Sequence, residues 1–116
     1  MSITRIAQGP RMSQAVVHGN IVYLAGQVAN KTAGASVDEQ TREILASIDS
    51  LLAQAGSDKT KILSATIYLV DMATFPEMNK AWDGWVAQGH TPARATVEAK
   101  LAAAPYKVEI AVIAAK

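Results

Sequence analysis

Two ionisable side chains stand out because each lies in a segment that is otherwise built for the interior of a protein. Arg94 lies in residues 91–101, TPARATVEAKL, where polar and apolar residues alternate as in a β-strand with one polar face. Glu109 lies in residues 107–114, KVEIAVIA, between branched apolar residues. A carboxylate there is costly unless it is paired, hydrogen-bonded or partly protonated. Two interpretations are open for both residues: ordinary or structurally paired charges, or a functional site.

The expected pairing of these two strands limits how their charges can meet. A tight hairpin between the last two strands would place Glu109 opposite Glu98. Arg94 would then lie about four residues, or ~13 Å, further along the sheet. We therefore expect Arg94 and Glu109 either at separate ends of one cleft or in contact by another route, such as across a subunit boundary.

Most familiar signatures of chemistry are missing from the sequence. It contains no glycine-rich phosphate loop and no nucleophile elbow. It has no cysteine, which excludes disulfides and thiolate chemistry. His18 and His90 adjoin glycines in expected loops, where a solvated histidine is the simpler interpretation than a ligand or base. We expect neither a metal site nor a cofactor.

Composition indicates one soluble domain over residues 1–116. Half of the residues are apolar, and eleven basic side chains nearly balance ten acidic ones, leaving a formal net charge of +1. This balance leaves no excess of positive charge that would favour binding to nucleic acid. No apolar run approaches the ~20 residues of a membrane span, and the first ten residues lack a signal-peptide core. We expect a cytoplasmic protein that binds neither nucleic acid nor membranes.

Turn and periodicity signals divide the chain into eight elements in the order β-β-β-α-β-α-β-β. This order predicts an α/β fold with two helices on one face of a mixed sheet. The expected elements are a strand in residues 1–8, two strands around a turn at 18–20, a helix over 36–56, a strand over 62–70, a helix from 74, and strands within 91–101 and 107–115.

Capping signals support both helices. Ser36 with Glu39, and Thr74 with Glu77, fit capping boxes, in which each side chain binds a free backbone N–H of the first turn. Gly56 suits a left-handed helix stop.

The last strand indicates self-association. Val108, Ile110 and Val112 point to one side of this strand, whereas Ala111 and Ile113 point to the other. Strands that are apolar on both faces are normally buried on both, and two helices cover only one face. We therefore expect a homo-oligomer, whose interfaces are suitable places for ligand clefts.

Three segments together resemble the RidA family, also called YjgF or L-PSP: LAGQV at 24–28, PARATVE at 92–98 and KVEIAVIA at 107–114. Residues 67–86 match the family's strand–helix segment, so the resemblance covers nearly the whole chain. It implies a chorismate-mutase-like fold and a homotrimer with three clefts between subunits. It also implies cofactor-independent enamine/imine deaminase activity, in which 2-imino or 2-enamino acids are hydrolysed to 2-keto acids and ammonium.

The same resemblance implies roles for five residues. Arg94 matches the arginine that grips the substrate carboxylate, a role suited to the two parallel bonds of a guanidinium. Glu109 matches the glutamate held near the attacking water. Gly26 matches a position whose backbone lines the pocket, Asn79 matches an asparagine near the cleft, and Thr96 occupies a wall position that is often cysteine.

The sequence also departs from the family pattern. Where the deaminases carry a tyrosine after an N-terminal Gly-Pro, this chain has Arg11 or Met12. The missing tyrosine and the threonine at position 96 both change the walls of the substrate pocket, at the points that would contact the side chain and the nitrogen of the substrate. Arg11 either adds a second positive group, suited to a larger or dianionic substrate, or is a solvated loop residue.

Three functions therefore compete. The first is a deaminase of 2-imino and 2-enamino acids, and the second is a non-catalytic trimer that binds small carboxylates as a carrier or regulator. The third is ribonuclease activity, which ranks last because the sequence supplies neither a basic track nor the acid–base pair that RNA cleavage needs.

Overall fold

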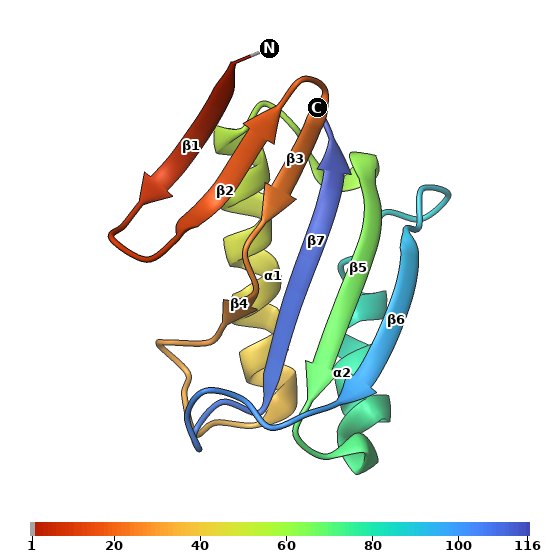
Figure 1. Cartoon of the computed structure of the whole chain (residues 1–116). Helices are drawn as coiled ribbons and strands as arrows, with labels where there is room; N and C mark the ends of the chain where they lie inside the picture. Colours follow the sequence, from red (N-terminus) through yellow and green to blue (C-terminus); the bar gives the residue numbers. More distant parts are fainter. Residues whose placement is uncertain (1) are drawn as a thin grey trace.

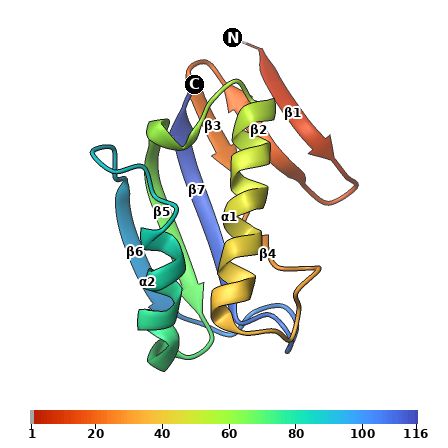
Figure 2. The ribbon, with the colours of Figure 1, turned by 180° about the vertical axis from the view of Figure 1, so that it is seen from behind.

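The computed structural model describes residues 2–116; Met1, which the expected first strand and domain included, lies outside them. Over these residues the chain forms one seven-stranded sheet with two α-helices packed on one face (Figures 1 and 2). The predicted order of elements is confirmed, with one additional two-residue strand. The elements are β1 (Ile3–Gln8), β2 (Ser13–His18), β3 (Ile21–Leu24), β4 (Gln27–Val28), α1 (Val37–Gln54), β5 (Ile62–Leu69), α2 (Phe75–Asp83), β6 (Ala93–Glu98) and β7 (Val108–Ala115).

The strand order differs from the expected hairpin at the C-terminal end. The sheet runs β1-β2-β3-β7-β5-β6, with β4 beside β7, so β5 separates β6 from β7 (Figure 1). Glu109 lies opposite Tyr68 of β5, and Glu98 lies opposite Leu69, so the predicted pairing of Glu109 with Glu98 is wrong. The physical reason is that β5, α2 and β6 form a crossover unit, which pairs β6 in parallel with β5.

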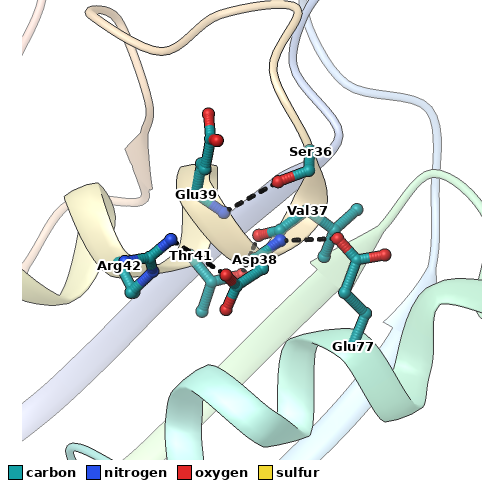
Figure 3. Close-up of polar contacts among 7 residues, drawn as sticks. All are labelled: Ser36, Val37, Asp38, Glu39, Thr41, Arg42 and Glu77. Carbon is teal, nitrogen blue, oxygen red and sulfur yellow. Dashed lines mark hydrogen bonds and ion pairs between the residues drawn. The ribbon is translucent and has the colours of Figure 1, made fainter.

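The first turn of α1 is capped by residues from two elements (Figure 3). The Ser36 hydroxyl accepts a hydrogen bond from the Glu39 N–H at 3.1 Å, which confirms half of the predicted capping box. No return bond from the Glu39 carboxylate forms within residues 2–116. Instead, Glu77 of α2 accepts from the Asp38 N–H at 2.8 Å. A carboxylate from the second helix therefore stabilises the N-terminus of the first and ties the two helices together.

The capping box predicted for α2 does not form. The Thr74 hydroxyl donates to the Asp71 carbonyl at 2.6 Å and makes no cap to the helix. A short 3-10 turn, Met72–Thr74, precedes α2, and the Asp71 side chain caps it by accepting from the Ala73 N–H. Local side-chain bonds of this kind compete with a helix cap, and Glu77 is engaged with α1.

The core lies between the sheet and the helices. Helix α1 packs along β7 and against α2, and α2 covers the β5–β6 side (Figure 2). Burial alternates along β5 and β7, so one face of each strand supplies the core. The fully buried side chains in this layer include Val22, Ile44, Ile48, Leu52, Ile67, Leu69, Met78 and Ile110.

Within residues 2–116, no helix packs on the other face of the sheet (Figure 1). Tyr23, Val97 and Ile113 lie on it and are 46%, 42% and 37% exposed. Large apolar side chains on three strands of one open face form a surface of the kind that protein interfaces cover. We call this surface, on β2, β3, β4, β7, β5 and β6, the open face. No helix within residues 2–116 is long and apolar enough to cross a membrane.

Candidate functional site

Arg94 lies on the helix side of β6, at the edge of the sheet. The register pairs it with Ala65 of β5, a buried residue of the core face. Its guanidinium carbon lies 5.3 Å from the ring centre of Trp82 and 5.8 Å from that of Phe75, both on α2. These distances fit cation–π contacts, which restrict where the guanidinium can go. It makes no ion pair with a carboxylate of residues 2–116, so its hydrogen-bond donors are free for a ligand.

Two other predicted residues lie beside Arg94. Thr96 follows two positions later on the same face of β6, and Asn79 lies on α2 one turn from Phe75 and Trp82. The hydroxyl of Thr96 and the amide oxygen of Asn79 are buried without a hydrogen-bond partner. Buried polar atoms without partners are rare, and functional sites are among the places where they occur.

Arg94 and Thr96, but not Asn79, line an open cavity of about 390 Å³ together with Met72 and Phe75. The alternation predicted for β6 is confirmed, but its polar face is directed toward α2 and its apolar face, with Ala95 and Val97, lies on the open face. An edge strand permits this arrangement because long polar side chains reach solvent past the edge of the helix.

Glu109 lies on the opposite side of the sheet from Arg94. The register places it between Val28 of β4 and Tyr68 of β5, all on the open face. The carboxylate lies against Gly26, where a side-chain Cβ would come within 2.1 Å of a Glu109 oxygen. It makes neither a hydrogen bond nor an ion pair inside residues 2–116. Glu109 is therefore a half-buried, unpaired carboxylate whose present position against the backbone requires a residue without a side chain at position 26.

The segment that carries Gly26 is held by two glutamines. The Ala25 N–H donates to the Gln14 carbonyl at 2.9 Å. The Gln27 side chain donates to the Gln14 side chain at 2.9 Å and to the Ala25 carbonyl at 3.0 Å. These hydrogen bonds hold the connection between β3 and β4 in place, and this connection positions Gly26 against the Glu109 carboxylate.

Arg11 belongs to neither group. It lies in the turn between β1 and β2, beside an open cavity of about 450 Å³ that Pro10 and Met12 also line. Strand β1 and strand β6 are the two opposite edges of the sheet, so one chain does not bring Arg11 to Arg94. Its predicted contribution to a substrate pocket remains a prediction.

The histidines and acidic residues form no further centre. His18 ends β2, and His90 lies in an exposed loop where its Nδ1 is 3.3 Å from the Gln88 carbonyl. The described part of the chain contains no group of three or more side chains that could hold a metal ion.

The carboxyl groups with shifted pKa values lie elsewhere. Burial acts to raise the pKa of Glu43, but hydrogen bonds from the Thr32 hydroxyl and from the Lys31 and Thr32 N–H groups outweigh it and lower the pKa. Hydrogen bonds from the hydroxyl and N–H of Thr60 lower the pKa of Asp58. Both carboxylates anchor loops, so these shifts are structural.

Tyr68 is a potential site residue that sequence reasoning missed. It faces the open side directly beside Glu109. A strand over residues 62–70 implies that Tyr68 and Thr66 share a face, but not which strand lies next to them. Only the pairing of β5 with β7 makes Tyr68 a neighbour of Glu109.

Comparison with known proteins places the chain among close relatives over its whole length. The sequence model of the family described as "Endoribonuclease L-PSP" matches residues 2–116. A RutC family protein from Haemophilus influenzae is 49% identical over 98% of both chains, and the RutC family protein YoaB from Escherichia coli K12 is 49% identical over 99% of both.

A solved structure agrees equally well. The crystal structure of a member of the YjgF protein family from Neisseria meningitidis superposes with a TM-score of 0.97 at 46% identity, covering 100% of this chain and 96% of that one. The family predicted from three short segments is thereby confirmed: the chain belongs to the RidA family, also called YjgF, RutC or L-PSP.

Proposed function

We propose that the protein hydrolyses reactive 2-imino and 2-enamino acids to 2-keto acids and ammonium, without a cofactor, in clefts between the subunits of a homotrimer. In this proposal Arg94 of one subunit grips the substrate carboxylate and Glu109 of a neighbouring subunit activates water. The cytoplasm is the expected site of this reaction, which would remove reactive intermediates.

The observation that carries the proposal is the unpaired guanidinium of Arg94 held over two aromatic rings. Contacts with Trp82 and Phe75 limit its movement before a ligand arrives, so less conformational entropy is lost on binding. A planar guanidinium with free donors matches the two oxygens of a carboxylate. All the proposed substrates carry that carboxylate next to the reacting carbon.

The placement of Glu109 supports a site between subunits. Arg94 and Glu109 lie on opposite faces of the sheet, so a single chain does not direct both at one small molecule. The open face around Glu109 is apolar and uncovered. A neighbouring subunit that packs on this face with its own β6 edge would bring a second Arg94 to Glu109.

The chemistry follows from these two groups. Water attacks carbon 2 of the protonated imine, and one of its protons passes to the Glu109 carboxylate as the C–O bond forms, which leaves a neutral carbinolamine. Glu109 returns that proton to the carbinolamine nitrogen, the C–N bond breaks to release ammonia, and the remaining hydroxyl proton is lost as the carbonyl forms. The products are the 2-keto acid and ammonia, which is protonated in solution. Because Gly26 has no side chain, the Glu109 carboxylate can lie directly against the backbone in the position from which it would accept the proton.

The direct test generates 2-imino acids in situ from several amino acids with an amino-acid oxidase and follows keto-acid release. We expect the wild type to accelerate release above spontaneous hydrolysis. Arg94→Ala should lower kcat/KM about 100-fold, because it removes two charge-assisted hydrogen bonds worth about 3 kcal/mol together. A wild type that accelerates no substrate contradicts the deaminase proposal, and an active Arg94→Ala variant contradicts the carboxylate clamp.

A non-catalytic carboxylate-binding trimer is the second candidate. It is favoured by one observation: the cavity beside Arg94 is formed by one chain, without Glu109. Keto acids that bind the wild type in a calorimetric titration, with no imine turnover, would establish this alternative. Ribonuclease activity, which the name "Endoribonuclease L-PSP" of the matching family suggests, has least support because the net charge is +1 and the sequence contains no basic run for an RNA backbone.

A further inference from the structure

Four side chains lie side by side across the open face, at the level of Glu109. Val28 of β4, Glu109 of β7, Tyr68 of β5 and Val97 of β6 are matched in register across these strands. Tyr68 is the polar neighbour of Glu109 in this row. It is half-buried, and its hydroxyl makes no hydrogen bond within residues 2–116.

Glu109 and Tyr68 are directly opposed on β7 and β5 and share one face of the sheet. Directly opposed residues of paired strands have Cβ atoms about 4.5–5.5 Å apart. The carboxylate lies over Gly26, on the β4 side of β7, whereas Tyr68 lies on the β5 side. No hydrogen bond joins the two polar groups within residues 2–116, which leaves both free to bind water.

We propose that Tyr68 is a further catalytic residue, whose phenol hydroxyl and the Glu109 carboxylate together hold the attacking water. This inference rests on the proposed deaminase function. The water donates one hydrogen to Glu109 and accepts a hydrogen bond from the phenol, which leaves its second lone pair free to attack carbon 2 of the imine. Glu109 takes the proton, while Tyr68 keeps its own and fixes the orientation of the water.

Other hydroxyl groups of the open face lie further from Glu109 and are less well placed to share a water with it. Thr66 lies opposite Ala111, two residues along the strands and thus about 6.6 Å from the level of Glu109. Tyr23 lies opposite Ile113, four residues from Glu109 along β7. Tyr23 has the same side chain on the same face, so it provides a matched control.

Tyr68→Phe tests the proposal in the imine assay. We expect kcat to fall about tenfold, the effect of one lost hydrogen bond in the transition state. KM should stay within about twofold, because the carboxylate clamp is intact. Tyr23→Phe should leave both constants unchanged. If the wild type is active and Tyr68→Phe retains its kcat, or loses activity only through KM or thermal stability, the role of Tyr68 is refuted while the deaminase function stands.

A second measurement does not depend on turnover. A crystal structure of the assembled protein should show a water within about 2.7–3.2 Å of both the Tyr68 hydroxyl and a Glu109 oxygen, and a structure of Tyr68→Phe should lose it. A wild type that turns over no imine refutes the deaminase function and, with it, catalysis by Tyr68. A wild-type structure without the bridging water refutes the shared water position whatever the activity.

Discussion

The Arg94 region and the Glu109 region differ in how much of each a single chain completes. Arg94 lies on the helix side of an edge strand, with its guanidinium over Trp82 and Phe75. Glu109 lies on the open face, where it contacts the backbone at Gly26 and has no ionic partner within residues 2–116. Helix α2 of the same chain holds Arg94 in place, whereas the apolar surface around Glu109 is left uncovered by residues 2–116.

Under the proposed function, the Arg94 and the Glu109 of one chain belong to two different clefts, each of which a neighbouring subunit completes. A binding group profits from being rigid before the ligand arrives, and α2 supplies that rigidity to Arg94. A carboxylate that handles water needs a cavity closed against bulk solvent. On the open face, only another subunit would provide that closure.

The largest effect should come from disrupting the proposed subunit interface on the open face, which would cover Glu109. Ile113→Glu places a charge in the centre of the open face, and burying it unpaired would cost several kcal/mol. We expect a monomer by analytical ultracentrifugation and imine turnover reduced more than about 100-fold. Ala46→Glu, on the exposed outer side of α1, should assemble and react as the wild type does. A fully assembled Ile113→Glu variant would show that the open face is not the interface.

Mixed assemblies test whether the two regions meet between subunits. Arg94→Ala and Glu109→Gln should each lose about 100-fold in kcat/KM. When the two variants are unfolded together and refolded at equal amounts, about a quarter of the clefts in a cyclic trimer join an intact Arg94 to an intact Glu109. Activity should therefore recover to roughly a quarter of the wild-type value. No recovery in co-assembled trimers would place both residues in a site within one subunit.

A smaller effect is expected from Gly26→Ala, which perturbs the Glu109 region alone. The new Cβ would lie 2.1 Å from a Glu109 oxygen, so the carboxylate has to move. We expect kcat to fall about tenfold, with KM for the carboxylate little changed. Gly84→Ala is the matched control, because its nearest contact would be an ordinary 3.7 Å. Equal kcat values for both variants would exclude a catalytic role for the position of Glu109.

The smallest effect concerns the Arg94 region. Phe75→Leu removes one ring from beneath the guanidinium, an interaction worth about 0.5–1 kcal/mol at exposed positions. KM should rise about two- to fivefold, while kcat is retained because Glu109 is untouched. Met72→Leu, which changes the same cavity without an aromatic contact, should leave KM near the wild-type value. A fall in kcat instead would show that the two regions are coupled.

Most of the architecture could be predicted from local patterns. The order of strands and helices, the Ser36 cap, the left-handed Gly56 with φ of 81° and the alternation in β6 all follow from residues close together in the sequence. The Thr74–Glu77 capping box fitted the same kind of pattern and was wrong. Glu77 instead caps α1, 39 residues away, and local sequence carries no information about a partner at that distance.

The candidate site, like the fold, could be predicted from the sequence only in part. By itself, the sequence determined the family and singled out Arg94, on a strand with one polar face, and Glu109, in an otherwise apolar strand. Only the tertiary structure decided that β5 lies between β6 and β7, that Arg94 and Glu109 occupy opposite faces, and that Tyr68 adjoins Glu109. Alternation states which residues of one strand share a face. It cannot state which face or which neighbour they have, because these depend on pairing between segments far apart in the chain.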